Sequence, residues 1–144
     1  DADLWAALET AQAAEFVKAK PLGLDEPVEQ GGRNLSGGQK QRVAFARALI
    51  LDPKIIVADE AFSMLDVSMR SQVVNLLLKL QERLGLSYVV VANDLGLVRH
   101  ISDKVLIMHQ GEIVEQGLTR DVFANPQHEV TKRLIQNHGH EYRR

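Results

Sequence analysis

The most constraining feature of this sequence is a short apolar run that ends in two acidic residues. The run is Ile55-Ile56-Val57-Ala58, and it lies between Pro53 and the pair Asp59-Glu60. An apolar run bounded by proline and by charge is typical of a strand buried in a parallel sheet. Ligands of open α/β sheets bind at the carboxyl ends of such strands. The pattern therefore predicts an α/β fold with a carboxylate-bearing site after residue 58.

A second feature is the segment Leu35-Ser36-Gly37-Gly38-Gln39, which precedes a helix expected over residues 40–51. Ser36 is a good N-cap, because its hydroxyl can accept a backbone N–H that the helix leaves unpaired. Gly37 and Gly38 lack a Cβ atom, so another molecule can approach the backbone closely. The start of a helix also favours anions, and Lys40 adds positive charge nearby. A Ser-Gly-Gly loop is equally an ordinary helix entry, so the segment alone leaves both interpretations open.

The rest of the sequence alternates further helices and strands, as expected of an α/β domain. Apolar spacing, caps and breakers predict helices over residues 2–18, 67–84, 95–101, 119–123 and 129–136. Apolar runs predict a second buried strand over 88–92 and a hairpin formed by 104–109 and 112–115. Gly85 is expected to stop the long helix and Thr119 to cap a short one, and the polar tail 138–144 is expected to fray.

Composition narrows the class of protein. The net charge of −2 gives no electrostatic argument for nucleic acid. Cysteine is absent, which excludes a disulfide framework and a thiolate metal site, and the five histidines lack ligand spacing. No apolar stretch approaches the roughly 18–20 residues that a membrane span needs. Any membrane contact is therefore expected to occur through a partner.

Several segments together resemble an ABC-transporter ATPase. Residues 35–39 resemble its signature motif, residues 55–60 its Walker B strand, and Ser63-Met64-Leu65-Asp66 its D-loop. The resemblance implies a partial P-loop NTPase domain, with a mostly parallel sheet flanked by helices and part of the helical signature subdomain. It divides the chain into a helical subdomain (1–51), the C-terminal part of the ATPase core (52–124), and a C-terminal helix with its tail (125–144).

The two ends of the chain resemble different branches of the family. Residues 3–8 and 31–34 are similar to the helical subdomain of ABC exporters. The hairpin segment 110–115 and residues 125–128 resemble oligopeptide and dipeptide importer ATPases, most closely the Sap-type peptide-uptake systems. The direction of transport is therefore open.

The resemblance also implies roles for individual residues. Asp59 would hold Mg²⁺ through water, and Glu60 would polarise the attacking water. Asp66 would lie at the interface of a head-to-tail dimer, although an N-cap for the following helix is an equally simple use of its carboxylate. The signature would contact the γ-phosphate of ATP held by the second subunit through Ser36, Gly37, Gly38 and Gln39.

Asn93 departs from the family pattern, which has a catalytic histidine just before Asp94. Asparagine keeps a neutral N–H donor, but it is shorter and cannot become cationic. A lost hydrogen bond to a charged group costs roughly 1.5–3 kcal/mol. This corresponds to some ten- to hundredfold in rate, at about 1.4 kcal/mol per tenfold. We therefore expect slow hydrolysis at the site that Glu60 and Asn93 complete.

The phosphate loop G-x-x-x-x-G-K-[ST] is not found in these residues. The nearest pattern, residues 32–38, places Gly38 where the lysine belongs. The chain thus resembles the C-terminal part of an ATPase domain, and we expect it to be inactive alone. Its sheet should keep an unprotected edge and some exposed apolar surface.

The function that the resemblance implies is ATP binding and hydrolysis in an ABC transporter that moves peptides. Its partners would be a second ATP-binding subunit and transmembrane permease subunits, at the cytoplasmic face of the inner membrane. The alternative is a non-catalytic half that supplies the signature to a partner's nucleotide site. A DNA-repair or chromosome-organising ATPase is less consistent with the acidic balance and the missing heptads.

Overall fold

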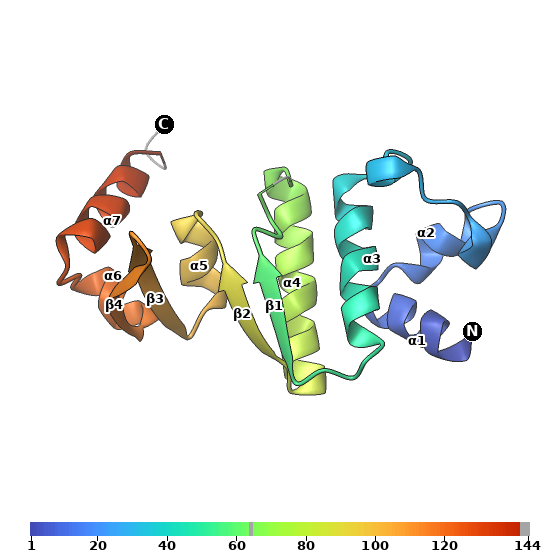
Figure 1. Ribbon diagram of the computed structural model, residues 1–144, viewed down its shortest axis with the longest axis horizontal. Helices are drawn as coiled ribbons and strands as arrows, with labels where there is room; N and C mark the ends of the chain where they lie inside the picture. The colour runs from blue at the N-terminus through green and yellow to red at the C-terminus, as the bar shows by residue number, and fades with distance from the viewer. Residues whose placement is uncertain (64, 142–144) are drawn as a thin grey trace. The chain divides into compact units, whose positions relative to one another are not determined.

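The structure is a computed structural model that describes residues 1–63 and 65–141, with side chains described as far as Asn137 apart from residue 64. Met64 of the expected D-loop and the end of the polar tail lie outside the described residues. The chain forms two compact units, Asp1–Val91 and Ala92–Arg144 (Figure 1). The division at residues 51 and 124 follows motifs and stays a prediction.

The first unit contains six helical segments and a two-stranded sheet among its described residues. Its elements are α1 (Ala2–Thr10), α2 (Ala14–Lys18), η1 (Gly23–Asp25), η2 (Gln30–Gly32), α3 (Gly37–Leu49), β1 (Ile55–Asp59), α4 (Val67–Leu84) and β2 (Ser87–Val91). The predicted long helix α4 is confirmed at both ends, and Gly85 follows it in the left-handed conformation.

The single helix expected over residues 2–18 is wrong. The chain turns between α1 and α2, where Gln12 has a φ of 54° and the N–H of Ala13 donates to the carbonyl of Leu8 at 2.7 Å. Ala11 and Ala13 are fully buried beside this turn. Alanine is the best helix former, but the packing of these two small side chains overrides its propensity.

Helix α3 starts at Gly37, three residues before the predicted start at residue 40. The signature glycines therefore belong to its first turn. Its buried residues are Gly38, Phe45 and Ala46, whereas Ala44 is exposed.

Strands β1 and β2 are parallel, as predicted, and pair in register from Ile55–Ser87 to Asp59–Val91. Ile56 and Ala58 are buried, as expected for the face on which the crossover helix of a β-α-β unit packs. The other face is open: Ile55, Val57, Val89 and Val91 are 60%, 67%, 51% and 50% exposed.

The expectation that both strands are buried is therefore wrong for this face, whereas the expected exposed apolar surface is confirmed. Tyr88 of β2 has a buried hydroxyl without a hydrogen-bond partner among the described residues. Burial raises the pKa of this tyrosine to about 12.

In its described residues, the second unit consists of a hairpin and three helices. Its elements are α5 (Leu95–Ile101), β3 (Lys104–His109), β4 (Glu112–Leu118), α6 (Thr119–Ala124) and α7 (Glu129–Glu141). The hairpin is antiparallel, and its turn at Gln110-Gly111 has φ values of 51° and 85°. This double positive φ is the geometry that two-residue hairpin turns favour. Strand β4 runs to Leu118 and α7 to Glu141, both beyond their predicted ends.

The core of the second unit lies where α5, the hairpin and α6 pack together. It consists of Val98, Val105, Ile107 and Val122. Glu115 of β4 accepts the backbone N–H groups of Gln127 and His128, both at 2.9 Å, and so holds the chain just before α7.

Thr119 does not cap α6, contrary to the prediction. It is the first helical residue, after an N-cap at Leu118, and its buried hydroxyl has no hydrogen-bond partner in the described part of the chain. The backbone explains its position, because the N–H of Thr119 donates to the carbonyl of Asp103 at 2.9 Å.

Candidate functional site

The start of α3 is fixed by a pair of reciprocal hydrogen bonds. The N–H of Gln39 donates to the hydroxyl of Ser36 at 3.2 Å, and the N–H of Ser36 donates to the side-chain carbonyl of Gln39 at 3.0 Å. This capping box confirms the predicted N-cap and also engages the Gln39 side chain. The N–H groups of Gly37 and Gly38 make no hydrogen bond within the described residues. Two donors therefore remain at the positive end of the helix, where an anion is favoured.

The two signature glycines have different surroundings. Gly37 is exposed, whereas Gly38 is buried. A Cβ atom at Gly38 would collide with the terminal methyl group of Met69 on α4. The expectation that both glycines give another molecule room is thus corrected for Gly38, where the space is filled by the chain's own methionine.

Asp59 and Glu60 lie at the carboxyl end of the parallel sheet, as predicted. Asp59 is the exposed last residue of β1. Glu60 is exposed and has a φ of 45°, a left-handed conformation that costs of order 1–3 kcal/mol for a non-glycine residue. Hydrogen bonds on both sides maintain it: its N–H donates to the carbonyl of Val91 at 2.9 Å, and its carbonyl accepts the hydroxyl of Ser63 at 2.9 Å.

The described residues of this site could supply only a small part of the ligand shell of a Mg²⁺ ion. No group of three or more histidine, aspartate or glutamate side chains in the described part of the chain could hold a metal ion. Mg²⁺ usually binds through one or two carboxylates and completes its shell with water and phosphate oxygens. The exposed carboxylate of Asp59 fits that restricted role.

Asp66 is the N-cap of α4, which confirms the structural interpretation of this residue. Its carboxylate accepts the N–H of Met69 at 2.9 Å. Met69 is also the residue that fills the space beside Gly38, so the start of α4 is packed against the start of α3.

The structure brings the predicted residues together in two groups. The signature residues and Asp66 are linked through the contact between α3 and α4, and Asp59 lies beside Glu60 at the end of β1. Asn93 is exposed and belongs to the second unit, where Asp94 caps α5 by accepting the N–H of Leu97 at 3.0 Å.

Arg42 is a residue whose use the sequence did not indicate. Its guanidinium donates to the carbonyl of Gln12 at 3.0 Å and to the side-chain oxygen of Gln72 at 3.2 Å. Each partner is thirty residues away along the chain, in opposite directions. No local sequence pattern signals such a contact.

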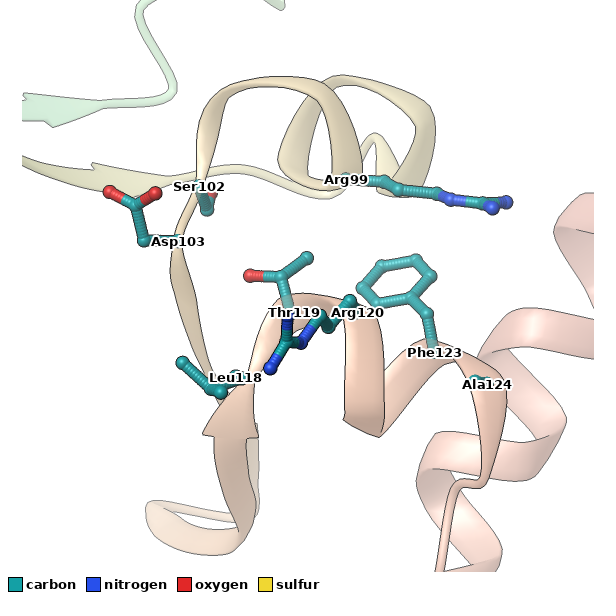
Figure 2. Close-up of a pocket in the computed structure, with 8 residues that line it drawn as sticks. All are labelled: Arg99, Ser102, Asp103, Leu118, Thr119, Arg120, Phe123 and Ala124. Atoms are coloured by element: carbon teal, nitrogen blue, oxygen red, sulfur yellow. The ribbon is translucent and has the colours of Figure 1, made fainter.

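A hollow of about 550 Å³ in the second unit is separate from these residues. It lies between the end of α5 and α6, and Figure 2 shows the guanidinium groups of Arg99 and Arg120 pointing in different directions. The residues that line it include none of the predicted site residues. The candidate site is therefore the signature together with the acidic end of β1.

A capped Leu-Ser-Gly-Gly-Gln helix in the same α/β unit as a strand ending in Asp-Glu is the arrangement of an ABC-type ATPase. The family model described as "ABC transporter" matches residues 3–63, which include both features. The chain therefore contains part of an ABC transporter ATPase domain, as predicted, and the predicted fold class is confirmed.

Relatives of known name agree with the predicted Sap-type likeness. Over 104 residues the chain is 62% identical to the putrescine export system ATP-binding protein SapF of Escherichia coli (strain K12), covering 72% of this chain and 39% of that protein. Over 100 residues it is 55% identical to the dipeptide transport ATP-binding protein DppF of Haemophilus influenzae, covering 69% of this chain and 31% of that protein.

A solved structure resembles nearly the whole chain. It is a bacterial Atm1-family ABC exporter with ATP bound, with a TM-score of 0.76 and 29% identity over 96% of this chain and 24% of the exporter chain. The chain thus spans well under half the length of the proteins it matches. Within its described residues, no helix combines the length and the apolar character needed to cross a membrane.

Two substitutions at Asp66 separate its capping role from any role of its charge. Asp66→Ala should lower the free energy of unfolding of the chain by about 1 kcal/mol, because the Met69 N–H loses its acceptor. Asp66→Asn should change the free energy of unfolding by no more than a few tenths of a kcal/mol, since asparagine caps equally well. Urea unfolding measures both, and equal losses in the two variants would contradict the capping role.

Proposed function

We propose that this chain is the signature-bearing C-terminal part of the ATP-binding subunit of an ABC transporter that moves peptides. The observation that carries the proposal is the start of α3, where the capping box leaves the N–H groups of Gly37 and Gly38 without an acceptor among the described residues and where Ser36 and Gly37 are exposed. The relative named for dipeptide transport supports peptides as the substrate class. Another relative is named for putrescine export, so the transported substrate has to be measured directly.

The proposed reaction is phosphoryl transfer from ATP to water. Glu60 would orient the attacking water, and Asp59 would hold Mg²⁺ through water, with the ion neutralising charge on the phosphates. Gly37 and Gly38 would donate their N–H groups to the γ-phosphate of a nucleotide carried by the other subunit, with Ser36 and Gln39 fixing that geometry. Each of these residues acts by position and charge rather than by forming a bond to the substrate.

The proposed partners follow from this arrangement. The signature would meet a second ATP-binding subunit in a head-to-tail dimer, with Asp66 at the same interface, and permease subunits would provide the membrane path. The assembly would lie at the cytoplasmic face of the inner membrane. The likeness to an exporter solved with ATP bound supports a nucleotide-binding role for this assembly.

A second candidate function is a non-catalytic half that supplies only its signature. It would use the capped signature at the start of α3, which lies entirely within this chain. Such a chain would stabilise a partner's nucleotide without hydrolysing one held by itself.

Mg-ATP binding tests the proposal and separates the two candidates. We expect no binding to the chain alone, and nucleotide-dependent association when a homologous subunit with a phosphate loop is added. Isothermal titration calorimetry measures the first and sedimentation velocity the second. Tight binding to the chain alone, below roughly 10 μM or about −7 kcal/mol, would contradict the proposed division of the site. ATP turnover that depends on Glu60 in a subunit completed with a phosphate loop would favour the catalytic candidate.

Asn93→His tests the expected slow hydrolysis. In such a completed subunit this change should raise kcat by roughly ten- to hundredfold, because a hydrogen bond to a charged phosphate is regained. Asn93→Gln is the matched control, since it lengthens the side chain without adding a group that can become cationic. An unchanged kcat in Asn93→His would show that this position does not limit the reaction.

A further inference from the structure

Helices α3 and α4 are joined at two points just behind the signature. The first is the contact of Gly38 with the terminal methyl group of Met69. The second is the hydrogen bond from Arg42 to Gln72, at 3.2 Å. Each point lies on one α3 residue and one α4 residue, so together they restrict both sliding and rotation of the two helices.

Arg42 also reaches a third segment. Its other terminal nitrogen donates to the carbonyl of Gln12 at 3.0 Å, at the left-handed turn between α1 and α2. The guanidinium is a rigid planar fork that can bind two acceptors at once, which a lysine ammonium on a flexible stem does less well. One half-buried side chain thus links the α1–α2 turn, α3 and α4.

The hydrogen bond between Arg42 and Gln72 lies the same number of residues after the cap of each helix. Arg42 follows the cap Ser36 by six residues, and Gln72 follows the cap Asp66 by six residues. Six residues of helix correspond to about 9 Å. The hydrogen bond between Arg42 and Gln72 therefore lies at a similar distance from each of the two helix starts.

We propose that Arg42 is a positioning residue that, through Gln72, holds the signature start at Ser36 and the α4 start at Asp66 at a fixed separation. Its part in the reaction rests on the proposed function, because both helix starts would face the partner subunit's nucleotide. The geometric part depends on this chain alone and can be tested without nucleotide.

A distance measurement tests the geometric part. The chain contains no cysteine, so Ala44→Cys on α3 and Asn75→Cys on α4, both exposed, can carry two spin labels without background. Electron paramagnetic resonance should give a narrow distance distribution in this labelled chain. Arg42→Met and Gln72→Ala should each broaden it, whereas Arg47→Met, at an exposed position of the same helix, should leave it unchanged.

A kinetic measurement tests the positioning part, in a subunit where this chain follows the phosphate-loop segment of a Sap-type relative. Arg42→Met should lower kcat roughly tenfold with an unchanged KM for ATP, since Arg42 would set geometry without touching the nucleotide. Arg42→Lys should recover part of the loss. Arg42→Met combined with Gln72→Ala should be no slower than Arg42→Met alone, as expected of residues that act through one another.

Each experimental outcome decides either the geometric part or the positioning part of the proposal. A narrow distribution in Arg42→Met, with helical circular dichroism unchanged, would overturn the geometric part. If Arg42→Met lost its helical signal, the milder exposed variant Gln72→Ala would decide the same point. A broadened distribution with an unchanged kcat would overturn the positioning part. Absence of turnover in the unmodified subunit would contradict the proposed function, while the distance measurement would still decide whether Arg42 sets the geometry.

Discussion

The capping box between Ser36 and Gln39 is the interaction on which the candidate site depends. A helix start has unpaired N–H groups, and here two of the local donors are used internally whereas those of Gly37 and Gly38 are not. The cap therefore does more than start α3. It decides which donors remain for an anion, and it fixes their direction along the helix axis.

The packing behind this helix start gives the arrangement its rigidity. Gly38 admits the Met69 side chain, Met69 donates its N–H to Asp66, and Arg42 binds Gln72 one turn further on. Because Met69 packs against Gly38 and also donates its N–H to Asp66, removing Met69 or Asp66 would change stability and site geometry together. This is the reason that conservative pairs, such as alanine and asparagine at Asp66, are more informative than single truncations.

The sheet illustrates which structural features could be predicted from the sequence and which could not. The bounds of α4, the parallel pairing of β1 with β2 and the hairpin followed from apolar spacing, breakers and turn residues, which are local signals. The face of the two strands that is exposed could not be predicted, because exposure depends on what packs against Val57 and Val89.

The same limit applies at individual residues. The Ser36 and Asp66 caps were predictable, because a cap bonds within its own first turn. The turn at Gln12 and the contacts of Arg42 were not, because they join segments that are distant along the chain. The strained backbone of Glu60 has no sequence signal either, although its carboxylate was placed correctly at the end of β1.

An amide map of the ¹⁵N-labelled chain, mixed with an unlabelled homologous subunit that carries a phosphate loop, tests most directly whether the donors of Gly37 and Gly38 meet a partner's nucleotide. On addition of Mg-ATP to the mixture, we expect the largest chemical-shift changes at the N–H groups of Gly37 and Gly38, and none of comparable size when Mg-ATP is added to the chain alone. Unchanged Gly37 and Gly38 signals in the mixture, with changes confined to the second unit around Arg99 and Arg120, would contradict this expectation.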